Sequence, residues 1–126
     1  MTKLLSLLLG SFLLAASAVH AGAGHDHGPK HGGVVHEVGD IAGELVVKAD
    51  TMTLHLFDHD KPLPTTGVKA EATVHSGGGK MAVTLAPAGD NKLAAQGSFK
   101  TGVGVRVAVV VSLADKREAK LNFRLK

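Results

Sequence analysis

The side chains most suited to chemistry in this sequence are its histidines, which cluster toward the N-terminal end. The chain has eight histidines and no cysteine. Neutral imidazole is the commonest protein ligand for Zn²⁺, Cu²⁺ and Ni²⁺, so the cluster indicates a metal site built from His, Asp, Glu and backbone atoms. Seven of the eight follow position 24: His25, His27, His31, His36, His55, His59 and His75.

The densest group lies in GHDHGPKHGG, residues 24–33. His25-Asp26-His27 supplies two imidazoles and a carboxylate, and in an extended chain the two His backbones lie about 6.6 Å apart. Glycines on both sides of His31 let the backbone bend back, so His31 can join the same ion. The same glycines favour disorder, so binding must also offset ordering entropy. The segment predicts an adaptable metal site, with a solvated, metal-free tail as the alternative.

A second candidate is HLFDHD, residues 55–60. On one straight strand, His55 and His59 would lie about 13 Å apart, too far for one ion. The run after His55 favours a turn at Asp58, and His59 with Asp58 or Asp60 could then complete a site begun by the tail. The alternative is that the two aspartates only shape the turn and His59 is exposed.

The remaining histidines flank this region. His36 lies near the start of the first expected strand, where it could anchor the tail's metal or be an ordinary surface residue. His75 precedes a glycine-rich turn and is interpreted as surface. The predicted ligands of a divalent Zn, Cu or Ni ion are therefore His25, His27, His31, His36 and His59.

Catalysis is not expected. Ser76, Ser98 and Ser112 are scattered without a motif, and no cysteine nucleophile exists. The SGGGK segment, residues 76–80, lacks the spacing and the following helix of a phosphate loop, and it is better interpreted as a hairpin turn. The sequence predicts a binding protein rather than an enzyme.

Composition argues against nucleic acid. Fourteen basic and eleven acidic side chains give a weak, scattered positive charge, and the chain has no Trp or Tyr. After residue 21 the only aromatic rings besides histidine are Phe57, Phe99 and Phe123. A surface that stacks bases is therefore not expected.

The first residues are typical of a secretory signal peptide. Lys3 is followed by an apolar run over residues 4–16 and then by small residues. Cleavage is possible after Ala18, Ala21 or Ala23, and Ala21 is preferred. An uncleaved anchor is the alternative, but the run is short for a span of about 20 residues. We expect a signal peptide over 1–21, a flexible arm over 22–33 and one domain over 34–126, exported to the periplasm without a membrane anchor.

Strand-length apolar runs follow Gly33, separated by turn residues. Runs of this length and spacing predict an all-β fold, an antiparallel β-sandwich or barrel of seven or eight strands. The runs cover residues 34–38, 44–48, 52–57, 68–75, 80–86, 92–99, 103–113 and 119–125.

Alternation along the runs predicts which side chains face the core. Met52, Leu54 and Leu56 should face inward, which places His55 on the other side with Thr53 and Phe57. A long inward stripe of valines is expected at alternate positions from 103 to 111. Several small side chains are also expected inside: Ala70, Ala72, Ala82, Ala94 and Ala108.

Three segments carry a resemblance to known proteins: HGGVV (31–35), TLHLFDHDKPLPTTG (53–67) and TLAPAGDNKLAAQGSF (84–99). The chain resembles small exported His-rich proteins of β-proteobacterial type, associated with heavy-metal or copper resistance and efflux. Its body, from about Gly32 onward, is similar to immunoglobulin-like modules of the YtkA/FixH and CopC kind. One departure is that copper carriers of the CopC kind use a histidine near the mature N-terminus, which here requires cleavage just before His25.

The resemblance implies an immunoglobulin-like β-sandwich and a periplasmic role in heavy-metal homeostasis or resistance. Such a protein would buffer or carry a metal ion, and its partner would be a periplasmic efflux or metal-handling protein. The alternative is a protein-interaction or assembly accessory module that binds no metal, with the His-rich arm as a spacer.

Overall fold

Alternating apolar and polar side chains organise the chain into strands. The computed structural model describes residues 28–126, so the predicted signal peptide and the first part of the arm lie outside the described residues. Within 28–126 the regular elements are all strands, and no helix there could span a membrane. The all-β prediction is confirmed. The nine strands are β1 (Val34–Val38), β2 (Ile41–Val47), β3 (Thr51–Asp58), β4 (Lys61–Pro62), β5 (Lys69–Ser76), β6 (Gly79–Pro87), β7 (Lys92–Gln96), β8 (Arg106–Ser112) and β9 (Glu118–Arg124).

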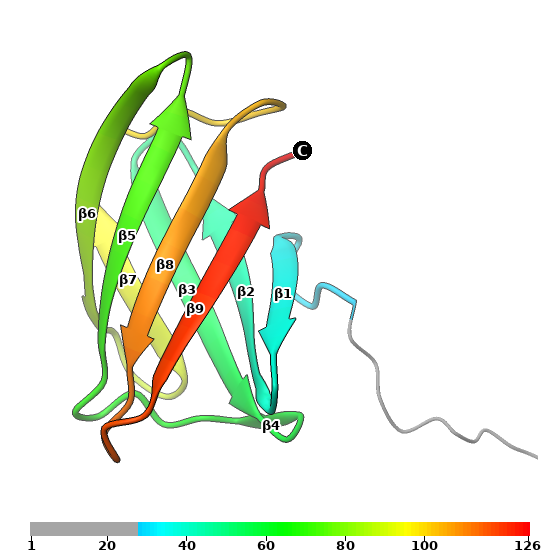
Figure 1. Cartoon of the computed structure of the whole chain (residues 1–126), viewed down its shortest axis with the longest axis vertical. Coiled ribbons are helices and arrows are strands. Elements are labelled where there is room, and N and C mark those ends of the chain that lie inside the picture. The colour runs from blue at the N-terminus through cyan, green and yellow to red at the C-terminus, as the bar shows by residue number, and fades with distance from the viewer. Residues whose placement is uncertain (1–27) are drawn as a thin grey trace, which may run out of the picture.

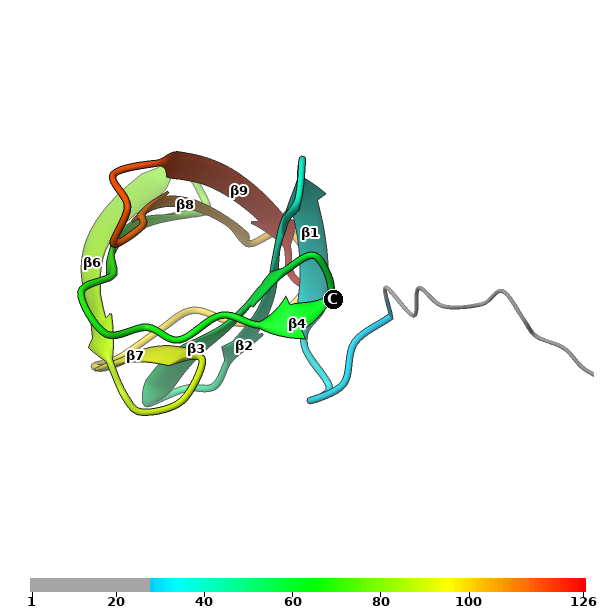
Figure 2. The ribbon, with the colours of Figure 1, turned by 90° about the horizontal axis from the view of Figure 1, so that it is seen from below.

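The strands pack as two layers around one core (Figure 1, Figure 2). Every pairing is antiparallel, in the order β1-β2-β3-β7-β6-β5-β8-β9, with the short β4 paired to β3. Leaving out β1 and β4, β2-β3-β7-β6 and β5-β8-β9 reproduce the strand order of the two immunoglobulin constant-type sheets. β6 passes between layers, because its first part pairs with β5 and its last residues with β7. β1 lies beside β9, so the sandwich is nearly closed on that side.

The core lies between the two layers, and the predicted inward faces largely account for it. Met52, Leu54 and Leu56 are fully buried, as predicted. Val107 and Phe123, from the other layer, belong to the same core, and each is only about 1% exposed. Burial of each such side chain contributes roughly 1.5–3 kcal/mol, so these large residues provide most of the stability.

Some predicted faces were wrong. Val103 is 90% exposed, because the ladder of β8 begins only at Arg106 and the preceding Gly102 and Gly104 adopt positive φ. Ala82 is exposed and Ala108 half-buried, since their neighbours Val83, Val107 and Val109 take the inward positions. Ala94 is half-buried rather than part of the core.

Two tight turns follow from the residues that allow positive φ. The β5–β6 hairpin turns at Gly77-Gly78, as predicted for SGGGK. The β3–β4 turn uses His59 and Asp60, with φ of 52° and 66°, the conformation of a type I′ turn, which favours Asn, Asp and Gly. The chain therefore turns directly after Asp58, as predicted, and His59 lies at the tip of that turn.

Candidate functional site

A buried carboxylate stands on the outer face of β2. Glu44 pairs with Val35 on β1 and with His55 on β3. Directly paired residues point to the same face, and the adjacent Leu45 and Leu54 face the core. Glu44 therefore points away from the core, yet it is only 1% exposed. What covers it is the segment that precedes β1.

Glu44 holds this segment through three backbone hydrogen bonds. The amide of Lys30 donates to Oε1 at 2.9 Å. The amides of His31 and Gly33 donate to Oε2 at 2.7 and 2.9 Å. The last four residues of the predicted arm, 30–33, are thus fixed to the sandwich by one side chain.

The hydrogen bonds keep this carboxylate ionised. Burial alone would raise the pKa of Glu44, but the backbone donors of Lys30, Gly33 and His31 outweigh it, and the pKa lies below its ordinary value of 4.5. A carboxylate that accepts several backbone N–H bonds is stabilised in its charged form. Near neutral pH the arm therefore meets a full negative charge.

Glycines make this docking possible. Gly32 has a φ of 78°, which turns the chain toward Glu44. A Cβ at Gly33 would overlap the carbonyl oxygen of Leu45. The His-Gly-Gly sequence therefore suits a chain that must bend and approach a neighbouring strand closely.

The docked arm brings two imidazoles together. The rings of His31 and His55 stack with centroids 3.8 Å apart and planes 9° from parallel. Beside them, the Lys30 ammonium lies 6.0 Å from the centre of the Phe57 ring, near the outer limit of a cation–π contact. His55 is 8% exposed, because the arm covers it.

Burial also fixes the protonation state of His55. Its pKa is lowered from the ordinary 6.5 mainly by desolvation, then by the nearby His31 and Lys92, with Glu44 acting in the opposite direction. Near neutral pH the ring is therefore neutral, the form that ligates metals.

The stacked geometry sets a condition for sharing an ion. A metal lies about 2.0–2.1 Å from an imidazole nitrogen, in the plane of the ring. Two parallel planes cannot both contain the same ion, so one ring must turn. His31 is exposed and His55 is buried, so His31 is the ring free to turn. Residues 28–126 contain no group of three or more His, Asp or Glu side chains that could hold a metal ion.

The predicted ligand His36 lies away from this cluster. It pairs with Gly43, one position from Glu44, so its side chain points to the opposite side of β1. The backbone N–H of Asn122 donates to its Nδ1 at 3.1 Å, and its ring meets Phe123 edge-on. If Nε2 of His36 bound a metal ion, the ring proton would lie on Nδ1, where it would face the N–H of Asn122 and break this hydrogen bond. His36 is thus part of the seam between β1 and β9.

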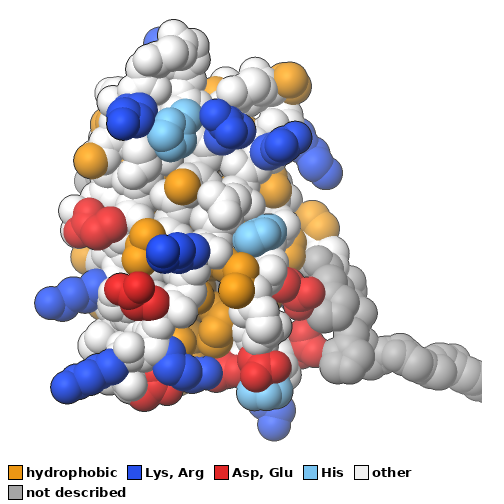
Figure 3. Space-filling view, viewed as in Figure 1, with side chains coloured by type: hydrophobic (Ala, Val, Ile, Leu, Met, Phe, Trp, Pro, Cys, Tyr) orange, Lys and Arg blue, Asp and Glu red, His pale blue; other side chains and the backbone are white. Residues whose placement is uncertain are grey.

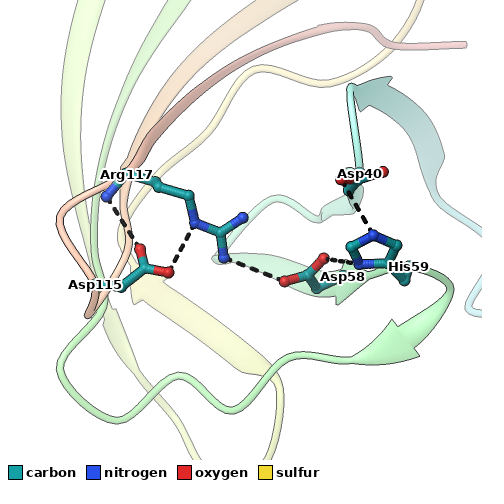
Figure 4. A network of polar contacts seen from close by, with 5 residues as sticks. All are labelled: Asp40, Asp58, His59, Asp115 and Arg117. Atoms are coloured by element: carbon teal, nitrogen blue, oxygen red, sulfur yellow. Dashed lines mark hydrogen bonds and ion pairs between the residues drawn. The ribbon is translucent and has the colours of Figure 1, made fainter.

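The predicted ligand His59 belongs to a different network (Figure 4). Its Nδ1 lies 2.7 Å from Asp58 and its Nε2 3.2 Å from Asp40. Asp58 also pairs with Arg117, which pairs with Asp115. These contacts join three turns at one end of the sandwich, and they occupy both ring nitrogens of His59.

The structure therefore separates the three predicted ligands that it describes. His31 lies on the outer face of β2–β3, His36 in the β1–β9 seam and His59 at the β3–β4 turn. His25 and His27 lie outside the described residues. Two residues of the observed cluster are not among the predicted ligands: Glu44 was not considered, and His55 was considered only as a partner of His59. Alternation could predict the outward position of His55, but no side-chain pattern marks the role of Glu44, because the partners of its carboxylate are backbone amides.

Comparisons with protein-family models, with curated proteins and with solved structures give no match for this chain.

Proposed function

We propose that this chain is a periplasmic metal-binding protein that takes part in heavy-metal homeostasis or resistance. It buffers or carries Zn²⁺, Cu²⁺ or Ni²⁺, and it passes the ion to a periplasmic efflux or metal-handling protein. The ligands are the arm histidines His25, His27 and His31, together with His55 of the sandwich.

One observation carries this proposal: Glu44 fixes the arm beside His55. The three backbone hydrogen bonds to its carboxylate hold residues 30–33 on the outer face of β2. His31 then stacks on His55, and His27 precedes His31 by only four residues. Because the chain is fixed at residues 30–33, a metal ion that recruits His25 and His27 has fewer residues to order than it would in a free tail.

The donor set fits a borderline transition metal. The site offers imidazoles and no thiolate, a combination suited to Zn²⁺, Cu²⁺ and Ni²⁺. His36 and His59 are left out of the set, because their ring nitrogens are engaged in the seam and in the turn network. The resemblance to exported His-rich metal-resistance proteins supports the same role.

Isothermal titration of the purified protein with Zn²⁺, Cu²⁺ and Ni²⁺ tests the proposal. A variant lacking residues 22–33 should lose the site. His55→Gln should lower the metal affinity about tenfold or more, because even the loss of a residue that only supports a ligand typically costs that much. His75→Gln, on the opposite sheet, is the matched control and should bind like the parent. If the deletion leaves affinity and stoichiometry unchanged, the arm is not the metal site. If the parent protein binds none of the three ions, the chain is better described as a non-metal interaction module.

A further inference from the structure

A row of basic side chains crosses the outer face of the second layer. Lys80 pairs with His75, His75 with Arg106 and Arg106 with Arg124, on β6, β5, β8 and β9. Paired residues share a face, and the adjacent Val74, Val107 and Phe123 are buried, so the row points outward. With strands about 4.8 Å apart, it spans about 14 Å. Lys, Arg and His side chains form a band across the upper part of this face (Figure 3).

The row has no acidic counterpart within the described part of the chain. None of the four side chains has an ion pair or hydrogen bond there. The next row on this face consists of Ala82, Thr73, Ala108 and Asn122. The nearest carboxylate on β5 is that of Glu71, two rows away, and it accepts hydrogen bonds from Thr84.

Without a bound anion, these neighbouring positive charges destabilise the sheet. Directly opposite residues have Cβ atoms about 4.5–5.5 Å apart, and like charges in such pairs are destabilising. Arg106 and Arg124 are such a pair. An anion bound between their guanidinium groups would reverse the sign of that interaction, because guanidinium forms paired hydrogen bonds with phosphate and carboxylate oxygens.

A groove adjoins the row and is lined by hydrogen-bond donors. Its lining includes three residues of the row, His75, Arg106 and Arg124, together with His36 and Ala108. His36 accepts the Asn122 N–H at Nδ1, so a neutral His36 ring carries its proton on Nε2 as a free donor.

We propose that this groove binds phosphate-bearing ligands, with Arg106 and Arg124 holding one phosphoryl group between them. Lys80 and His75 lie farther along the row and hold a neighbouring anionic group, so a ligand with several phosphoryl groups fits better than a single anion. The four residues of the row lie on β5, β8, β9 and the first part of β6, which pairs with β5, whereas Glu44 and His55 lie on β2 and β3 of the other layer. It is independent of the metal proposal. Soluble polyphosphate and phospholipid headgroups present the same chemistry.

Two probes distinguish these sources: titration with tripolyphosphate, and sedimentation with phosphatidylglycerol vesicles against phosphatidylcholine vesicles. The parent protein should bind at least one phosphate probe, and Arg106→Gln with Arg124→Gln should weaken that binding about tenfold or more, since two charge-assisted contacts are lost. Binding to tripolyphosphate alone assigns a soluble ligand, and binding to the anionic vesicles alone assigns a headgroup. Both results support the site.

The matched control removes two other charges from the same face. Lys69 and Lys120 are exposed outward residues of β5 and β9 away from the groove, and Lys69→Gln with Lys120→Gln should bind like the parent. Thermal unfolding checks folding: the double arginine variant should be at least as stable as the parent, because a like-charge pair is gone. Equal weakening in the control, equal binding of polyglutamate, or no binding to either phosphate probe would overturn the proposal.

Discussion

At the scale of single residues, Glu44 is the side chain on which the site depends. It lies at an outward position of β2, is 1% exposed, and accepts three backbone hydrogen bonds. A buried charge is tolerated only where such partners satisfy it. Sequence alone could not identify this role, because Glu44 begins an ordinary alternating run and its partners are backbone amides, which leave no mark on side-chain types.

Glu44→Gln should lower the free energy of unfolding by about 2 kcal/mol, since hydrogen bonds to a charged acceptor are lost and the new amide group presents a donor to backbone donors. Urea unfolding measures the loss, and hydrogen exchange at the amides of Lys30, His31 and Gly33 should accelerate. Glu71→Gln is the control: Glu71 is exposed on the other layer, so its change should stay within about 0.5 kcal/mol. Unchanged exchange at the three amides in Glu44→Gln would show that this carboxylate does not hold the arm.

The same carboxylate gives the arm a pH dependence. The folded pKa of Glu44 lies below the ordinary 4.5 because its backbone donors outweigh the effect of burial. Stabilisation by an acid with a depressed pKa is fully present above the unfolded value and is lost as pH falls through the folded value. Protection of the three arm amides should therefore hold from pH 7 down to about the ordinary pKa of 4.5, and it should be lost only as the pH falls further, through the lower folded pKa of Glu44. In Glu44→Gln this acid-dependent step should be absent, and its persistence would point to another titrating group.

At the scale of elements, period-two alternation predicted the strands well. Each of the eight expected runs corresponds to a strand, and only the two-residue β4 was missed, because Lys61–Pro62 has no apolar alternation. β2 begins three residues earlier than expected, since Gly43 interrupts its apolar pattern. The predicted inward orientation was wrong where an apolar run extended beyond the residues that pair with a neighbouring strand, as at Val103, which precedes β8. Alternation shows only which face of a single strand is apolar. The register between strands, and the passage of β6 from one layer to the other, depend on pairing partners that are distant in the sequence.

The junction between the arm and β1 should be intolerant of a side chain at Gly33. Gly33→Ala places a Cβ against the Leu45 carbonyl, so the arm must move, at a cost of about 1–3 kcal/mol, and amide protection at Lys30 and His31 should fall. Gly32→Asn is the control, because a Cβ there meets nothing within 4 Å and Asn tolerates the positive φ. Equal protection in the two variants would contradict close docking of this junction.

At the scale of the whole molecule, the sandwich separates two surfaces of different character. The β1-β2-β3 layer presents a docked arm, an anionic carboxylate and stacked imidazoles. The layer of β5, β8 and β9, with the first part of β6, presents the cationic row. A metal site and a phosphate site can therefore operate on one small domain without sharing residues. The sequence located the histidines, but only the fold shows that His31 meets His55 while His36 and His59 are turned to other contacts.

The metal site formed by the arm and His55 is tested most directly by nitrogen-15 NMR of the histidine rings during a Zn²⁺ titration of the purified protein. Ring nitrogens of His25, His27, His31 and His55 should shift together as one site fills, and the stacking of His31 on His55 should be lost as His31 turns. Those of His36, His59 and His75 should stay unchanged. Shifts confined to His36 or His59, or an unperturbed His55 at saturation, would contradict the claim that the Glu44-held arm and His55 form the metal site.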